Sequence, residues 1–104
     1  ELIGYDVTND IAVLRVDAKN LQPIEFADSD TLTTGETAIT IGSPGGLTYM
    51  NSISEGILSG INRTVTTNNT TVYDLIQTTA AINPGNSGGA LLNKEGKLIG
   101  LCVY

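Results

Sequence analysis

The sequence contains no histidine and no tryptophan, and it has only one cysteine and one phenylalanine. Histidine is the commonest general base in enzymes, so any imidazole that a catalytic group here requires has to come from outside this chain. The single cysteine, Cys102, excludes an internal disulfide and a cysteine-based metal site. It lies in the apolar run 98–103, where we expect a buried, unreactive thiol. We expect no metal and no cofactor.

Charged residues are also scarce, at 15% of the chain. Asp and Glu number 11 against 5 Lys and Arg, which gives a net charge of −6. The basic residues are scattered, so the sequence shows no basic patch for nucleic acid or an anionic membrane surface. No apolar run approaches the roughly 20 residues of a membrane-spanning helix. The 104 residues, of which 40% are hydrophobic, suit one small globular domain with no nucleic-acid partner.

Short runs rich in Ile, Val, Leu and Thr, separated by turn residues, predict an all-β fold. The expected strands are residues 2–5, 11–16, 37–41, 52–61, 72–79, 89–93 and 97–104. The run 52–61 also fits a helical stripe, but its glycines and serines favour a strand. Residues 62–71, nearly all Thr and Asn, are expected to form a solvated loop or hairpin tip.

Four smaller expectations concern the first half of the chain and its last turn. The strand 11–16 is apolar on both faces, so we expect it to be buried at its start. In the connection 21–35, Ile24 and Phe26 are the expected anchors, and residues 27–32 suit a helical turn with an Asp or Ser cap. Gly96 is available for the positive φ angle of a hairpin turn.

A serine lies among glycines in the stretch 82–91, which reads Ile-Asn-Pro-Gly-Asn-Ser-Gly-Gly-Ala-Leu. Glycines allow a sharp, exposed bend at Ser87, and the flanking peptide N–H groups can converge on one point. A nucleophile that attacks a carbonyl group needs both features. On spacing alone, an ordinary glycine-rich turn explains the stretch equally well.

Residues 85–89 also match G-x-S-x-G, the nucleophile elbow of α/β-hydrolases. That elbow is followed by a helix and later by Asp and His, whereas residues 90–104 contain neither residue type and predict a short strand and a hairpin turn. The chain order is instead Asp10 first and Ser87 late. This order suits the His–Asp–Ser sequence of chymotrypsin-type enzymes, with the histidine upstream of residue 1.

Five stretches run in order almost from end to end of the chain. They are Asn-Asp-Ile-Ala-Val-Leu-Arg-Val (9–16), Ala-Asp-Ser-Asp (27–30), Ile-Gly-Ser-Pro-Gly-Gly-Leu (41–47), Ile-Gln-Thr-Thr-Ala-Ala-Ile-Asn-Pro-Gly-Asn-Ser-Gly-Gly-Ala-Leu (76–91) and Gly-Lys-Leu-Ile-Gly (96–100). In these stretches the sequence resembles the HtrA (Deg) family of trypsin-like serine endopeptidases. The resemblance implies a chymotrypsin-like, antiparallel six-stranded β-barrel. Residues 1–34 would then be the end of the N-terminal barrel with the inter-barrel connection, and residues 35–104 a C-terminally truncated second barrel bearing the nucleophile loop.

The resemblance also implies catalytic roles. Ser87 would be the nucleophile, and Asp10 the carboxylate that orients the histidine; without the resemblance, Asp10 reads as an ordinary turn aspartate. The N–H groups of Gly85 and Ser87 would form the oxyanion hole. Asn86, which carries no charge to pair with a new N-terminus, would help to set this loop.

The implied substrate-binding residues are Ala81, Ile82, Leu101, Cys102 and Val103. Ala81 would lie at the base of the specificity pocket and Ile82 in its wall; since neither is charged, we expect a small or medium apolar side chain before the cleaved bond. The strand that starts at Leu101 would pair with extended substrate. Residues 43–50 and 62–73 correspond to loops that order the active site and sense activators in this family.

By this resemblance, the histidine-bearing part, the last strand and helix of the protease domain and any PDZ domain would lie outside the given sequence. We therefore expect a fragment of a longer protein, inactive alone and prone to self-association through unpaired strand edges. A natural pseudoprotease, or a peptide-binding or chaperone module, is the alternative. By resemblance, the partners would be unfolded or misfolded protein and peptide substrates and further copies in a homo-oligomer, and the location the bacterial cell envelope.

Overall fold

The computed structural model describes residues 1–43, 52–82 and 84–103, and its regular structure is almost entirely β-strand, as the sequence predicts. In chain order the elements are β1 (Leu2–Asp6), β2 (Ile11–Leu14), the 3-10 turn η1 (Ser29–Thr31), β3 (Thr37–Gly42), β4 (Ser52–Thr67), β5 (Thr70–Thr78), the 3-10 turn η3 (Pro84–Asn86), β6 (Ala90–Leu92) and β7 (Leu98–Leu101). No helix within the described ranges is long and apolar enough to cross a membrane.

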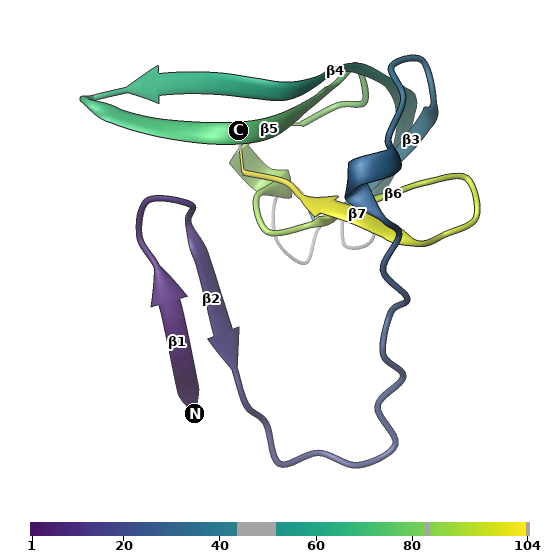
Figure 1. The fold of residues 1–104 in the computed structure, drawn as a ribbon. Coiled ribbons are helices and arrows are strands. Elements are labelled where there is room, and N and C mark those ends of the chain that lie inside the picture. Colours follow the sequence, from purple (N-terminus) through teal and green to yellow (C-terminus); the bar gives the residue numbers. More distant parts are fainter. Residues whose placement is uncertain (44–51, 83, 104) are drawn as a thin grey trace.

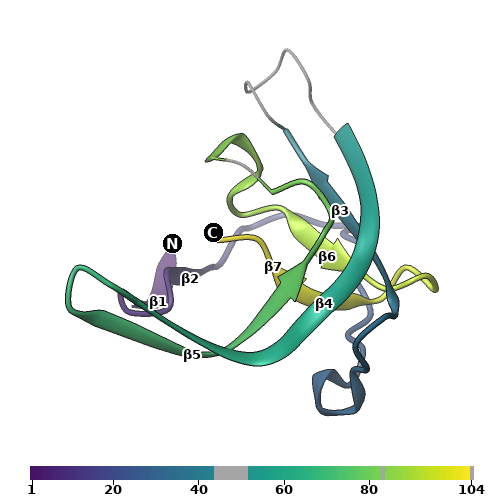
Figure 2. The same ribbon diagram turned by 90° about the horizontal axis from the view of Figure 1, so that it is seen from above.

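Five strands form one antiparallel sheet in the order β5-β4-β3-β6-β7. Figure 2 shows this sheet from above, curled into a partial barrel by the long arc of β4. The β4–β5 ladder has three register shifts between Leu58 and Val65. Such bulges bend a strand and increase its twist, which accounts for the curl. The predicted all-β antiparallel architecture is therefore confirmed, here with five strands in the sheet.

The β4–β5 hairpin is longer than the sequence predicts. Residues 62–71 were expected to be a loop or hairpin tip, but β4 continues to Thr67 and β5 begins at Thr70. The tip consists of Asn68 and Asn69 alone, both at positive φ (50° and 66°), as a two-residue hairpin turn requires. The threonines beside it are β-branched and suit exposed strand positions, and this preference outweighed the polarity of the segment.

A small core joins the strands of this sheet. The four buried side chains Ala38, Leu58, Leu91 and Ile99 come from β3, β4, β6 and β7, respectively. Ala27, Leu32 and Ile76 pack against them. Because Leu91 follows the Ser87 loop directly, the core fixes the point at which that loop enters the sheet.

The first two strands form a separate antiparallel hairpin. Figure 1 shows this hairpin apart from the larger sheet, with an extended connection between them. The prediction that the second strand is buried at its start is wrong: Ile11 is 43% exposed and Val13 is 53% exposed. Both faces are apolar, but the described part of the chain packs no second layer against either. The division of the chain at residue 34 stays a prediction.

The connection is attached to the sheet through its backbone. Ile24 and Phe26 were predicted as anchors, but their side chains are 46% and 74% exposed, so that prediction is wrong. Instead, the Ala27 N–H donates to the Leu98 carbonyl oxygen (2.9 Å), and the Leu98 N–H donates to the carbonyl oxygen of residue 25 (2.8 Å). The predicted helical turn is present as η1, and its cap is Asp28, whose carboxylate accepts from the backbone N–H of residue 30.

Candidate active site

Ser87 is exposed at the end of η3, on the loop that leads from β5 into β6. Two glycines follow it, each required by the backbone. Gly88 has a φ of +88°, a conformation that L side chains rarely adopt. At Gly89 a Cβ would clash with the Ile41 carbonyl oxygen and lie 2.9 Å from that of Asn86. The loop can therefore bend sharply at Ser87 only because both positions lack a side chain.

The segment after β7 holds this loop on its C-terminal side. The Gly88 N–H donates to the Cys102 carbonyl oxygen (2.7 Å), and the Cys102 N–H donates to the Gly89 carbonyl oxygen (2.9 Å). The Cys102 side chain is 2% exposed, and burial raises the pKa of its thiol. The predicted buried cysteine is confirmed, and its backbone contributes to the placement of the serine.

Asn86 holds the loop on its N-terminal side. Its side chain is 7% exposed, and Nδ2 donates to the Ala81 carbonyl oxygen (2.9 Å). Its backbone carbonyl oxygen accepts from the Gly89 N–H (2.9 Å). Among the described residues, Oδ1 has no hydrogen-bond donor; it faces Gly42, where a Cβ would lie 3.1 Å away. Ser87 is thus presented by a turn that is hydrogen-bonded on both sides.

Gly85, the other predicted oxyanion donor, lies in η3 two positions before Ser87, and both residues are exposed. Their N–H groups belong to the same short turn, so the structure brings the two predicted donors to one place in the fold. Their role in stabilising an oxyanion stays a prediction.

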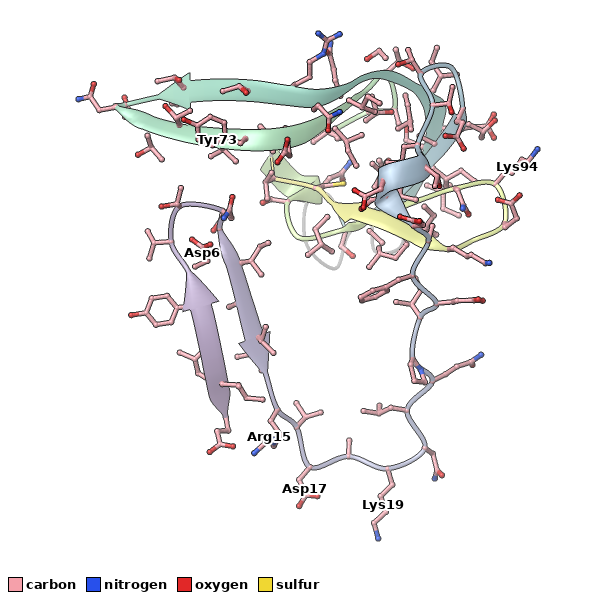
Figure 3. All side chains as sticks on the ribbon, in the orientation of Figure 1. Asp6, Arg15, Asp17, Lys19, Tyr73 and Lys94 are labelled. Carbon is pink, nitrogen blue, oxygen red and sulfur yellow. The ribbon has the colours of Figure 1, made fainter. Side chains whose placement is uncertain are left out.

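Asp10 lies in the turn between β1 and β2, is exposed, and has a φ of +59°. A different aspartate organises that turn: the Asp6 carboxylate accepts from the Thr8 N–H (3.0 Å), the Asn9 N–H (3.2 Å) and Asn9 Nδ2 (2.7 Å). These bonds, chiefly the one from the Asn9 side chain, lower the pKa of Asp6. Figure 3 shows Asp6 at this turn end of the hairpin. The Asp10 carboxylate itself makes no hydrogen bond or ion pair within the described residues.

Four of the five predicted substrate-binding residues line one hollow of about 770 Å³ on the inner side of the curled sheet. These four are Ile82, Leu101, Cys102 and Val103. The fifth, Ala81, does not line the hollow; it is exposed, and both of its backbone groups are hydrogen-bonded to side chains. Of the predicted activation loops, residues 62–73 belong to the β4–β5 hairpin, whereas residues 44–50 lie outside the described residues.

Sequence analysis missed two hydroxyl residues beside the loop, Thr40 and Ser54. Ser54 Oγ accepts from the Ala81 N–H (2.9 Å), and Thr40 Oγ1 lies 3.3 Å from the Ala81 carbonyl oxygen. Thr40 is 1% exposed, at an inward position of β3. The sequence could have indicated Thr40, because side chains alternate along a strand and Thr40 shares the inward face with Ala38. A polar side chain on that face requires a hydrogen-bond partner.

Comparison with known proteins places the chain in a family. A family model described as a trypsin-like peptidase domain matches residues 1–101. The chain belongs to the family of trypsin-like peptidases. The serine protease Do-like HtrB of Bacillus subtilis (strain 168) is 46% identical over 105 residues, which cover 97% of this chain and 23% of that protein. The serine protease Do-like HtrA of Lactococcus lactis subsp. lactis (strain IL1403) is 50% identical, over 96% of this chain and 26% of that protein.

Solved HtrA-type structures share the fold. The HtrA-type protease AlgW with a decapeptide superposes with a TM-score of 0.88 at 41% identity, over 100% of this chain and 31% of that one. Deg5 superposes with a TM-score of 0.84 at 36% identity, over 100% of this chain and 50% of that one. The chain thus spans about a quarter of the length of the curated HtrA relatives it matches.

Proposed function

We propose that this chain is the nucleophile-bearing part of an HtrA-type serine endopeptidase. The observation that carries the proposal is the presentation of Ser87. Its side chain is exposed, Gly88 and Gly89 follow it, and the loop is hydrogen-bonded to Ala81 through Asn86 and to Cys102 through Gly88. A solvated turn serine needs no such support on both sides.

The reaction proceeds through an acyl-enzyme. Ser87 Oγ attacks the carbonyl carbon of the substrate and gives its proton to a histidine from outside the chain, which Asp10 orients. The negative charge that develops on the carbonyl oxygen is stabilised by the N–H groups of Gly85 and Ser87. The histidine then protonates the leaving amine, and a water molecule, activated by the same histidine, releases the acyl group and regenerates Ser87.

The hollow beside the loop is proposed to bind the substrate. Ile82 lines it and is uncharged, which favours a small or medium apolar side chain before the cleaved bond. The segment formed by Leu101, Cys102 and Val103 continues from β7, the strand at one end of the sheet. An extended peptide can add to such an edge by main-chain hydrogen bonds. Accessible extended segments are typical of unfolded and misfolded proteins, which are the proposed substrates.

The proposed location follows the name of a relative. Matching proteins include one named a probable periplasmic serine endoprotease, from Halomonas elongata, which supports an envelope location for this one. We propose a homo-oligomeric enzyme, and we propose that the 104-residue chain alone is inactive, because it contains no histidine. For the isolated chain, peptide capture at the β7 edge is the second candidate.

The test uses the full-length protein with an unfolded substrate such as casein. Wild type is expected to cleave casein after apolar residues, and Ser87→Ala is expected to lose at least ~10³-fold of this activity. Ser59→Ala, the same change on β4 away from the loop, is the control and should retain it. Casein cleavage that survives Ser87→Ala would refute the proposed function.

A further inference from the structure

Ala81 is one of the points at which the sheet holds the nucleophile loop. It lies between the end of β5 and η3. Its N–H donates to Ser54 Oγ (2.9 Å), and its carbonyl oxygen accepts from Asn86 Nδ2 (2.9 Å). The same carbonyl oxygen lies 3.3 Å from Thr40 Oγ1. Side chains from β3, β4 and the loop itself therefore converge on the backbone of one residue.

Thr40 contributes a hydroxyl group that packing alone does not require. Its side chain is 1% exposed, and valine has nearly the same shape. Its single hydroxyl proton lies within reach of two carbonyl oxygens, those of Ala81 (3.3 Å) and Ser54 (3.4 Å). A buried hydroxyl is costly unless it is hydrogen-bonded, and the two backbone carbonyl groups within its reach offset that cost.

Resting on the function proposed above, we propose that Ser54 and Thr40 are positioning residues for the nucleophile. Neither carries out chemistry. Together they fix the backbone of Ala81, which in turn holds the Asn86 side chain in place. Asn86 then holds the turn η3 that presents Ser87.

This arrangement predicts how the kinetics respond to loss of either hydroxyl. Without it, the loop spends less time in the arrangement that presents Ser87. The rate of the chemical step then falls, while the binding of an extended peptide to the β7 edge is unaffected. The expected signature is a lower kcat at an unchanged KM, which general destabilisation does not produce once rates are referred to folded protein.

The experiment compares Ser54→Ala and Thr40→Val in the full-length protein with Ser59→Ala and Thr37→Val. The two control residues lie on the same strands, and their hydroxyls make no hydrogen bond within the described residues. We expect kcat and the rate of Ser87 phosphonylation by a fluorophosphonate to fall ~3- to 10-fold in the test variants, as one ordinary hydrogen bond accounts for. The controls should stay within ~2-fold of wild type, and Thr40→Ser and Ser54→Thr should restore the rates.

Two results would overturn the proposal. The first is a normal phosphonylation rate per folded molecule in Ser54→Ala and Thr40→Val. The second is an equal loss of rate in the matched controls.

A second readout separates this proposal from the proposed function. If wild type does not react with the fluorophosphonate at all, the proposed function fails. Amide hydrogen exchange at Ala81 then tests separately whether Ser54 fixes the backbone of Ala81. Exchange at Ala81 that is ~5-fold faster in Ser54→Ala but not in Ser59→Ala supports that role. Unchanged exchange at Ala81 overturns it.

Discussion

Replacing Asn86 by aspartate alters the chemistry of the nucleophile loop without altering its shape. Asn86 is 7% exposed, and its Nδ2 donates to the Ala81 carbonyl oxygen at 2.9 Å. In Asn86→Asp an ionised carboxylate would place one of its oxygens, a hydrogen-bond acceptor, at that distance from a second acceptor, the Ala81 carbonyl oxygen. It would also bury a negative charge at a position where the described residues offer the side-chain oxygen no donor.

Burial of this carboxyl raises its pKa in the folded protein above the unfolded value of about 3.9. Full burial raises a carboxyl pKa by up to about 3–5 units, so a rise of ~2–3 units is reasonable at this site. At 1.36 kcal/mol per unit, Asn86→Asp should destabilise the fold by ~3–4 kcal/mol at pH 7. When protonated, the carboxyl can donate to Ala81 as the amide does. The loss of folding stability in Asn86→Asp should therefore vanish below about pH 4, grow as the pH rises, and level off above the raised pKa.

The assay is denaturant unfolding of the full-length protein between pH 4 and pH 8. Asn93→Asp is the matched control, because within the described ranges the Asn93 side chain bonds only through its oxygen, which accepts from the N–H groups of Glu95 and Lys97. A carboxylate preserves that role, so we expect little change in the free energy of unfolding at any pH. If Asn86→Asp is as stable as wild type at pH 7, or equally destabilised at all pH values, the role given to the Asn86 amide is wrong.

Two further predictions concern the glycines and the first hairpin. Gly89→Ala should destabilise the fold by ~2–4 kcal/mol because its Cβ meets the Ile41 carbonyl oxygen. At Gly4 a Cβ would have no heavy atom within 4 Å, so Gly4→Ala should change the stability little. Equal unfolding temperatures for the two variants would contradict the steric argument. The lowered pKa of Asp6 means that its contribution to hairpin stability is present above the ordinary carboxyl pKa and is lost as the pH falls through the lowered one. Asn9→Ala should raise the Asp6 pKa, measured by NMR titration, and an unchanged titration would show that the Asn9 side chain is not the main cause.

Sequence reasoning worked best where one local rule decides the structure. Alternating β-branched residues predicted strands, Asp28 predicted a cap, and Gly96, at a φ of +81°, predicted the last turn. The buried Cys102 followed from the apolar run around it. The glycines of the loop and the order of Asp10 and Ser87 left an ordinary turn open, and the class of site was predicted from the resemblance to a known family.

The features that the sequence did not predict depend on which segments meet in space. Phe26 is exposed because the described residues bring no second surface to it, although its large apolar side chain suggests an anchor. Thr40 and Ser54 converge on Ala81, although they lie 41 and 27 residues before it in the sequence, respectively. No periodicity in the chain encodes those separations. They follow from the pairing of β3 with β4 and from the return of the chain after β5.

The most direct test of Ser87 as a nucleophile that requires a histidine from outside this chain is fluorophosphonate labelling followed by peptide mass spectrometry. The full-length protein and the 104-residue chain would be labelled side by side. We expect one adduct on Ser87 in the full-length protein, none in its Ser87→Ala variant, and labelling of the 104-residue chain that is slower by at least ~10³-fold. An adduct on another residue, or labelling of the short chain at the rate of the full-length protein, would contradict that assignment.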